Sequence, residues 1–358
     1  MLDLLIQNLN LILKRLIQRW LFFGTQHTYN NYLKIYMKRR QFLSLTTSAS
    51  LFALSMRGAN LFAGEATTAK PFKMLFAPRV GMPTFQEMAG KDEIKRMEFF
   101  KGQGFRGVEG VVFIQHKKPF SDKQKQRQKL IGEKAKELGL AMGPQSSMNE
   151  KDVPTMTANK TLDGKSGTTA IRDMLKRQLE TTFGVLENVG GKTFIIGPGA
   201  LDKELEWDRQ YANVVENMAF CADIVGKAGF VMEIEPLNTV SHPGVFCDRA
   251  ELGARICRDV NMPSCRILYD IFHEQMQVKN LDSLDNPDVW KYIESFHVAD
   301  APDRNEPGTG IIDYPKVFKK IWDKGFRGII GLEHMQSAKT IECEKQIIDR
   351  YRSYDALA

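Results

Sequence analysis

Short apolar runs alternate with helix-length amphipathic stretches along this chain from Phe72 onward. Such runs predict buried parallel strands, and eight are present, at residues 73–77, 108–113, 140–143, 193–196, 230–234, 265–269, 293–296 and 328–332. Helices are expected at 91–103, 123–138, 170–189, 211–227, 248–260, 284–290, 314–324 and 341–354. Eight strand–helix units predict an α/β fold, a single-domain (β/α)8 TIM barrel, and the absence of a GxGxxG motif after the first strand disfavours a doubly wound sheet.

The connection at 145–169 is unusually long and polar for a barrel of this kind. Two interpretations are open for it. It is either a mobile lid over the barrel mouth or a plain surface insertion.

Four polar side chains close the last four apolar runs: Glu235, Asp270, His297 and Glu333. The C-terminal ends of barrel strands converge on one mouth, so these side chains are expected to lie together. Three carboxylates and one imidazole suit Mn²⁺ or Mg²⁺, and they also accept Zn²⁺ or Co²⁺. A single Asp or His at a strand end is usually an ordinary polar residue, but four on consecutive strands predict one divalent metal site.

Four further polar residues are candidates for the same mouth, and a fifth, Glu233, is expected deeper in its strand. His273 is placed to donate to a substrate oxygen, with a surface or capping imidazole as the alternative. Arg304 suits a substrate carboxylate, since guanidinium binds one bidentately, and a solvated loop arginine is the alternative. Glu306 and Glu109 are also predicted to bind substrate. Glu233 points to the same strand face as the metal-ligand glutamate two residues later, and if buried it must be paired or protonated.

The formal charge of +7 is concentrated at the N-terminus. Residues 1–40 carry seven basic side chains and one acidic one, which leaves +1 for the remaining 318 residues. No nucleic-acid partner is therefore expected for the body. The five cysteines are odd in number and form no CxxC pair, so buried thiols are expected rather than a zinc ribbon or a full disulfide framework.

The segment that begins Met37-Lys38-Arg39-Arg40 resembles a twin-arginine export signal, with a basic start, a modest apolar stretch and small residues after it. It predicts the twin-arginine export machinery as a partner and a periplasmic or exported location. A basic amphipathic helix on a membrane surface is the alternative, and without a signal the location would be cytoplasmic. Met37 is a candidate true start. Residues 1–66 are excluded from the fold, which leaves 67–358 as the barrel domain.

Four motifs resemble those of the hydroxypyruvate isomerase family, within the xylose-isomerase-like (AP endonuclease 2-like) superfamily of barrels. They are residues 232–238, 269–273, 297–314 with its Glu-Pro-Gly-Thr-Gly loop, and 331–334. The resemblance implies the metal ligands Glu235, Asp270, His297 and Glu333. One departure concerns the substrate: hydroxypyruvate isomerases often have Gln at the position of His297, whereas related ketose 3-epimerases and sugar isomerases have His.

The resemblance implies proton transfer next to a carbonyl through an enediolate, with Glu235 and Glu333 as the acid and base. The expected reaction interconverts hydroxypyruvate and tartronate semialdehyde; the alternative is a ketose or keto-sugar 3-epimerase or a sugar isomerase. Either way the substrate is a small hydroxy-keto acid or sugar, and a homo-oligomer is compatible with the family. An AP-endonuclease-like phosphodiesterase is disfavoured because the near-neutral body has little affinity for DNA. Such enzymes also usually bind several zinc ions, which takes more histidines than the six in this chain. A non-catalytic sugar-binding barrel is disfavoured by the two intact glutamates.

Overall fold

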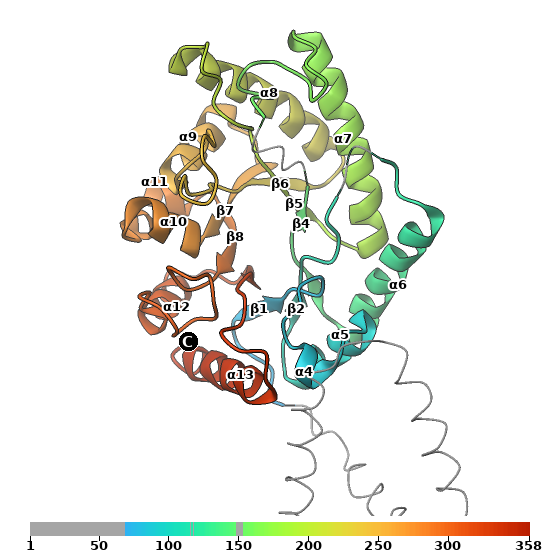
Figure 1. Cartoon of the computed structure of the whole chain (residues 1–358), viewed down its shortest axis with the longest axis vertical. Helices are drawn as coiled ribbons and strands as arrows, with labels where there is room; N and C mark the ends of the chain where they lie inside the picture. The colour runs from blue at the N-terminus through green and yellow to red at the C-terminus, as the bar shows by residue number, and fades with distance from the viewer. Residues whose placement is uncertain (1–68, 115, 117, 148–152) are drawn as a thin grey trace, which may run out of the picture. The chain divides into compact units, whose positions relative to one another are not determined.

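Parallel strands lie around a central axis in this protein, and helices cover their outer side (Figure 1). The computed structural model describes residues 69–114, 116, 118–147 and 153–358, which belong to one compact unit. The predicted export segment, residues 1–66, lies outside the described residues. None of the helices in the described ranges is long and apolar enough to cross a membrane.

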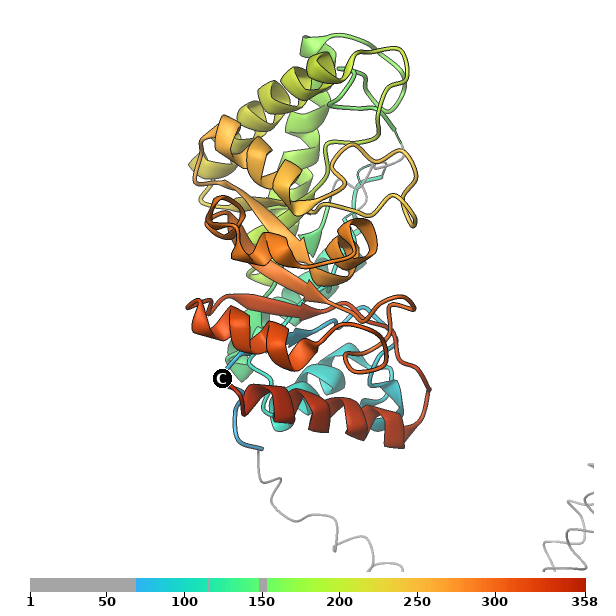
Figure 2. The same ribbon diagram turned by 90° about the vertical axis from the view of Figure 1, so that its left-hand side faces the viewer.

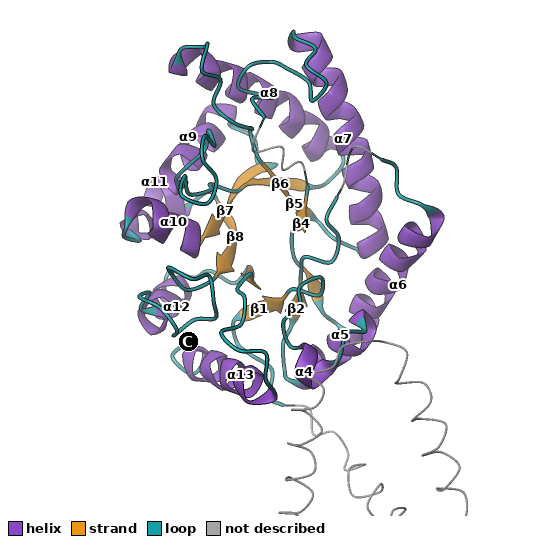
Figure 3. Cartoon of the chain, viewed as in Figure 1, coloured by secondary structure: helices purple, strands orange, loops and turns teal. Residues whose placement is uncertain are grey.

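The inner ring consists of nine strand segments in the part of the chain described, drawn in orange in Figure 3. Seven form one parallel sheet in the order β1-β9-β8-β7-β6-β5-β4, and β2 pairs in parallel with β3. Isolated parallel bridges between Arg79 and Glu109, and between Phe113 and Ser146, join the β2–β3 pair to both ends of that sheet. The segments are β1 (Leu75–Pro78), β2 (Gly107–Val108), β3 (Ala141–Met142), β4 (Gln145–Ser146), β5 (Thr193–Ile196), β6 (Val231–Ile234), β7 (Cys265–Asp270), β8 (Ile293–Val298) and β9 (Ile329–Leu332).

The third predicted strand, 140–143, corresponds to β3, and Gly143 and Pro144 separate it from β4, which lies at the start of the segment predicted as a connection. Proline has no backbone N–H to donate to a strand ladder, so the pairing is interrupted there. Counting β3 and β4 as one strand, the ring has the predicted eight strands. The predicted α/β barrel is confirmed.

Helices surround the strands, as the side view in Figure 2 also shows. Many begin with a local capping signal; for example, Ser121 and Gln124 form a reciprocal capping box at the start of α6. The helices are α4 (Gln86–Ala89), α5 (Glu93–Gly102), α6 (Asp122–Leu138), α7 (Thr168–Val189), α8 (Trp207–Lys227), α9 (Ala250–Val260), α10 (Ile271–Val278), α11 (Pro287–Trp290), α12 (Tyr314–Asp323) and α13 (Ile341–Asp355), with a 3-10 turn η1 (Asp282–Asp285) before α11.

Four further details differ from the sequence prediction. Helix α4 was not predicted. Helix α10 was not predicted, and it starts directly after Asp270, whose side chain accepts a hydrogen bond from the backbone N–H of His273. Strand β8 extends to Val298, so His297 lies within a strand rather than after it. The predicted second strand is paired as β2 only at 107–108, because Gly110 adopts a left-handed backbone conformation (φ 57°) that breaks the extended run.

All five cysteines are buried and free, which confirms the expectation of buried thiols. Two of them, Cys257 on α9 and Cys265 on β7, have their sulfur atoms 3.7 Å apart. Burial raises the pKa of the Cys221 thiol to about 12, so this side chain stays protonated and behaves as a small apolar residue.

The described part of the long connection, from residue 153 to α7, is packed beside α8. Thr157 is fully buried, and it donates to the Ala200 carbonyl (2.6 Å) and accepts from Asn213 (2.8 Å). Asn217 on the same helix donates to Asn159 (2.7 Å). These contacts favour the interpretation as a surface insertion.

Asp355, the last residue of α13, links the last helix to the first strand of the barrel. Its carboxylate accepts hydrogen bonds from the backbone N–H groups of Lys73 (2.9 Å) and Met74 (2.8 Å), immediately before β1. Strand β1 in turn pairs with β9 over four residues. The first strand is therefore held by the last strand and the last helix.

We expect Asp355→Ala to lower the free energy of unfolding by about 2 kcal/mol, since it removes two hydrogen bonds to a charged, largely buried acceptor. Urea denaturation followed by circular dichroism measures this loss. Asp349→Ala is a matched control on the same helix, because the Asp349 side chain is exposed. Equal stability of the two variants would contradict the role given to Asp355.

Candidate metal centre

The structure brings the four strand-end residues together at one point of the barrel mouth. Glu235 follows β6, Asp270 ends β7, His297 lies in β8 and Glu333 follows β9. Each offers one ligand atom, and these atoms all lie within 4.8 Å of one another. The parallel register explains the convergence, because Asp270 pairs with His297, and His297 pairs with the residue two before Glu333.

Burial divides the four residues into two kinds. Asp270 and His297 are almost completely buried, with 1% of each side chain exposed, whereas Glu235 and Glu333 expose 10% and 19% of theirs. The two glutamates therefore border the open mouth, and the other two residues form its floor. This arrangement lets the two glutamates reach a bound molecule.

The donor atoms fit a divalent cation. His297 Nδ1 and Glu333 Oε2 are buried and make no hydrogen bond of acceptable geometry, although they lie 2.5 Å apart. His297 Nδ1 is also 3.4 Å from Glu235 Oε1. Buried nitrogen and oxygen donors that face one another without hydrogen bonds are the donor set that such an ion would satisfy.

Two arginines balance the negative charge of this cluster. Arg79, directly after β1, contacts the Glu333 carboxylate through Nη1 and donates to Ser146 Oγ through Nη2 (3.1 Å). Arg304 Nη2 lies 3.2 Å from both Asp270 Oδ2 and Glu333 Oε2. Burial opposes ionisation of Glu333, but Arg79, His297 and Arg304 hold its pKa well below its usual value. Glu333 is thus a carboxylate at neutral pH.

In the two floor residues, Asp270 and His297, the pKa is raised rather than lowered. Burial raises the pKa of Asp270, and Arg304 opposes that increase. Burial disfavours the charged form of His297, yet the neighbouring carboxylates of Glu109 and Glu333 raise its pKa well above its usual value. Without an added cation, the imidazole supplies part of the positive charge that the carboxylates need.

His273 lies at the edge of the cluster and is only 2% exposed, so the surface-imidazole alternative is wrong. Its Nδ1 accepts from the backbone N–H of Asn238 (3.2 Å), while its Nε2 lies 3.1 Å from Arg304 Nη1 and 3.6 Å from Asp270 Oδ2. Burial lowers the pKa of His273 to about 3, so the ring is neutral. Both ring nitrogens face N–H donors, the Asn238 backbone at Nδ1 and Arg304 at Nε2, although a neutral ring carries its proton on one of them. The tautomer therefore depends on whether Arg304 stays beside Nε2 or turns to a bound molecule.

Arg304 is aimed into the mouth by the loop that follows β8. The Asp300 carboxylate accepts from the backbone N–H groups of four residues of this loop, at distances of 2.8 to 3.1 Å: Ala301, Gly308, Thr309 and Ile312. The Arg304 guanidinium also lies over the Phe272 ring, 4.9 Å from its centroid. The solvated-arginine alternative does not describe this residue, since only 27% of its side chain is exposed.

The structure gives Glu306 contacts within the protein. It is 2% exposed, and its two oxygens accept from the backbone N–H (2.8 Å) and the hydroxyl (2.6 Å) of Ser337. Glu306 therefore ties the loop after β8 to the segment after β9. Its contact with substrate stays a prediction.

Two further carboxylates lie below the cluster inside the barrel. Glu109 is fully buried, with one oxygen 3.2 Å from His297 Nε2 and 3.3 Å from Arg79 Nε. Glu233 is also fully buried, and Ser295 donates to it. Burial raises the pKa of Glu233 to about 8, so it is protonated at neutral pH, in agreement with the sequence argument that it must be paired or protonated.

Sequence reasoning missed Arg79 and Asn238. Arg79 follows β1 as directly as the four cluster residues follow or end their own strands, so the same rule applied to the first strand would have found it. Asn238 carried no comparable signal. Its importance depends on His273 being buried against it.

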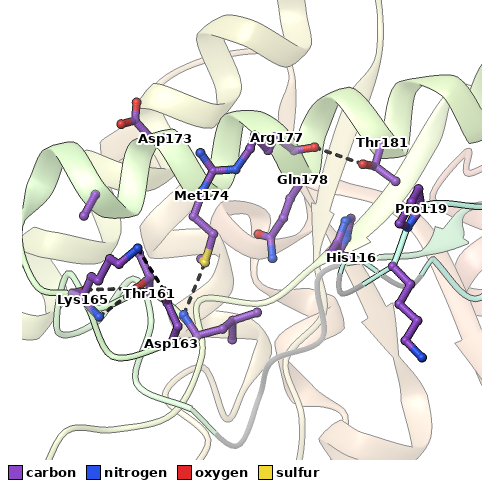
Figure 4. A pocket seen from close by; sticks show the side chains of 13 residues that line it. His116, Pro119, Thr161, Asp163, Lys165, Asp173, Met174, Arg177, Gln178 and Thr181 are labelled. Atoms are coloured by element: carbon purple, nitrogen blue, oxygen red, sulfur yellow. Dashed lines mark hydrogen bonds and ion pairs between the residues drawn. The ribbon is translucent and has the colours of Figure 1, made fainter.

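A separate surface cavity of about 610 Å³ lies between α7, residues 116 and 118–119, and the segment at 161–165 (Figure 4). Figure 4 shows Arg177 and Gln178 of α7 together with His116 at its wall. None of the four cluster residues lines this cavity. Its size therefore gives no argument about the metal centre.

Comparison with known proteins finds enzymes of the same fold. The chain is 29% identical to 2-oxo-tetronate isomerase of Cupriavidus necator over 152 residues, which are 42% of this chain and 58% of that protein. It is 32% identical to hydroxypyruvate isomerase of Escherichia coli over 142 residues, 40% of this chain and 54% of that protein. The chain thus spans little more than half the length of these relatives.

A solved structure and a family model give the wider relationship. The crystal structure of 3-keto-D-glucoside 4-epimerase from Escherichia coli superimposes with a TM-score of 0.58 over 78% of this chain and 100% of that one, at 16% identity, which establishes likeness of fold. The family model described as xylose isomerase-like TIM barrel matches residues 98–351, well over half of the chain. The chain therefore belongs to the xylose isomerase-like TIM barrel family.

Proposed function

We propose that this protein is a metal-dependent isomerase that moves a proton between two carbons of a small hydroxy-keto acid. The preferred reaction converts hydroxypyruvate to tartronate semialdehyde. The observation that carries this proposal is the pair of glutamates, Glu235 and Glu333, which both belong to the four-residue cluster and both border the open mouth. Two carboxylates on a shared cation site are what a proton transfer next to a carbonyl needs.

The cation would be held by Glu235, Asp270, His297 and Glu333, with Mn²⁺ or Mg²⁺ preferred and Zn²⁺ or Co²⁺ accepted by the same donors. When bound, such an ion draws charge from a substrate carbonyl and so makes the adjacent C–H more acidic. Asp270 and His297 are suited to holding it only, because both are almost fully buried.

The proton transfers are assigned to the two glutamates. In hydroxypyruvate, one carboxylate removes a proton from the hydroxymethyl carbon and an enediolate forms. The other carboxyl group, acting as the acid, returns a proton to the former carbonyl carbon, while the hydroxyl proton passes from the oxygen that becomes the aldehyde to the former carbonyl oxygen. Glu333, whose pKa is held low beside Arg79, His297 and Arg304, is ionised and able to accept a proton. Which glutamate removes the proton depends on which of the two hydrogens of the hydroxymethyl carbon faces it.

Arg304 and His273 would orient the substrate. Arg304 presents a guanidinium at the mouth, a group that pairs bidentately with a carboxylate. The neutral His273 ring presents its Nε2 to the same space. Once Arg304 pairs with the substrate carboxylate, this nitrogen would carry the ring proton and donate to a substrate oxygen. The names of the relatives, hydroxypyruvate isomerase and 2-oxo-tetronate isomerase, support a hydroxy-keto acid.

A keto-sugar epimerase or sugar isomerase is the second candidate. It uses the same four residues, and the histidine at position 297 favours it, as does the fold shared with 3-keto-D-glucoside 4-epimerase. A neutral sugar carries no carboxylate, so it has less need of Arg304. The two candidates therefore differ in what this side chain contributes.

We further propose that the protein is exported through the twin-arginine machinery to the periplasm. The support is the basic segment that begins at Met37 and the small residues that follow it. This route carries folded proteins, so the barrel would acquire its metal before export.

Glu235→Gln and Glu333→Gln are each expected to lower kcat by at least roughly 10²-fold, the scale of losing a general acid or base. Circular dichroism should remain that of the wild-type protein, because glutamine preserves the shape of each side chain. Turnover is measured with Mn²⁺ and hydroxypyruvate. Glu251→Gln, at an exposed position of α9, is the control and keeps full turnover. Full activity of either site variant would remove that residue from the mechanism.

Arg304→Gln is expected to raise KM for hydroxypyruvate by roughly 10- to 100-fold, since it removes a charged, bidentate partner of the carboxylate. Its effect on a ketohexose should be smaller. Both substrates are assayed with Mn²⁺, with Arg209→Gln at an exposed position of α8 as the control. Turnover of ketohexoses without turnover of hydroxypyruvate would favour the epimerase or sugar isomerase.

A further inference from the structure

Glu109 is a fully buried carboxylate on the inner side of His297, away from the open mouth. Both of its oxygens are inaccessible to solvent and lack a hydrogen bond of acceptable geometry. Its nearest polar neighbours are His297 Nε2 at 3.2 Å and Arg79 Nε at 3.3 Å. A substrate entering through the mouth would meet the histidine ring first, so this position is poorly suited to the substrate contact expected from the sequence.

The space for this carboxyl group is created by Gly331 on β9. Gly331 pairs with Ala77 on one side and with His297 on the other, so it faces the imidazole directly across the sheet. A Cβ atom at this position would overlap all three atoms of the Glu109 carboxyl group. Gly143 also leaves room, since a Cβ there would lie 2.7 Å from the Glu109 Cβ. Glycine is therefore needed at 331 for space.

The two ring nitrogens of His297 face different partners. Nε2 faces Glu109, and Nδ1 faces the Glu235 and Glu333 carboxylates. An imidazole that ligates a metal through one nitrogen usually donates its other N–H to a carboxylate or carbonyl, which fixes the tautomer and the ring orientation. The Arg79 guanidinium lies beside Glu109 and stabilises its charge.

We infer that Glu109 is the positioning residue of the metal centre: with a cation bound, its carboxylate accepts the N–H of His297 Nε2, 3.2 Å away, and so directs the Nδ1 lone pair to the cation, in a space that Gly331 leaves open. This inference rests on the proposed metal-dependent function. It assigns Glu109 a role in metal affinity rather than in substrate contact. Glu109 acts through His297 and touches neither the cation nor the substrate.

Titration of the metal-free full chain with Mn²⁺ in a calorimeter tests this role. We expect Glu109→Ala to weaken Mn²⁺ binding by roughly 10- to 100-fold, the usual effect of losing such a partner. Glu109→Gln retains an acceptor oxygen and should lose less. Gly331→Ala should also weaken binding by roughly 10-fold or more, since its Cβ displaces the carboxyl group. Glu187→Ala and Gly184→Ala on α7 are controls, because Glu187 is exposed and nothing lies within 4 Å of a Cβ at 184.

The double variant Glu109→Ala/Gly331→Ala separates this role from general destabilisation. If both changes act through one carboxyl group, the double variant binds Mn²⁺ no more weakly than Glu109→Ala alone. Thermal unfolding of the metal-free variants is measured in parallel, because a merely structural role would lower Tm and leave the Mn²⁺ Kd unchanged.

The outcomes are distinguishable. Wild-type Mn²⁺ affinity, within about twofold, in both Glu109 variants overturns the inference, and additive losses in the double variant overturn the part assigned to Gly331. If Glu109→Ala does not fold, Glu109→Gln and Gly331→Ala give the answer. Absence of Mn²⁺ binding by the wild-type chain would instead contradict the proposed function itself.

Discussion

Mutual repulsion of carboxylates at the barrel mouth is the constraint on which this site depends. Three carboxylate ligand atoms lie within 4.8 Å of one another, and each such pair repels by on the order of 3 kcal/mol at an effective dielectric constant of 20. Glu109 adds a fourth acidic group directly beneath them. Only cations placed between them make this arrangement stable. Arg79 and Arg304 supply two positive charges, and the protonated imidazole of His297 supplies a third. A bound divalent ion would replace the charge of the imidazole.

The cations and donors around the cluster are held by elements outside it. Asp300 folds the loop that carries Arg304, and Asn238 fixes the ring of His273 from the far side. The Asp300 carboxylate accepts from backbone N–H groups of its loop, and the backbone N–H of Asn238 donates to the His273 ring. Both supports therefore involve groups that are fixed in the main chain. A cluster supported in this way is organised before a ligand arrives, which lowers the cost of binding.

Much of the fold and the four central residues were predictable from the sequence, because the C-terminal ends of barrel strands converge on one mouth. Spacing along the chain was enough to identify Glu235, Asp270, His297 and Glu333 as members of one site. The surroundings were less accessible. Glu109 lies against His297 because a glycine on a third strand leaves space, and that depends on register between β8 and β9, which single-strand patterns do not contain. Helix α10 was missed because it has only eight residues, too few for a helical period to stand out in the sequence.

The hydrogen bonds of Asp355 to the backbone before β1 have a consequence for how the chain folds as it is synthesised. The first strand leaves the ribosome long before its partner β9 and its clamp on α13 exist. Until β9 and α13 have emerged, β1 has an unpaired edge, and the mouth at Arg79 lacks Glu333. The site thus forms only after β9 and α13 have been synthesised, when α13 closes the ring.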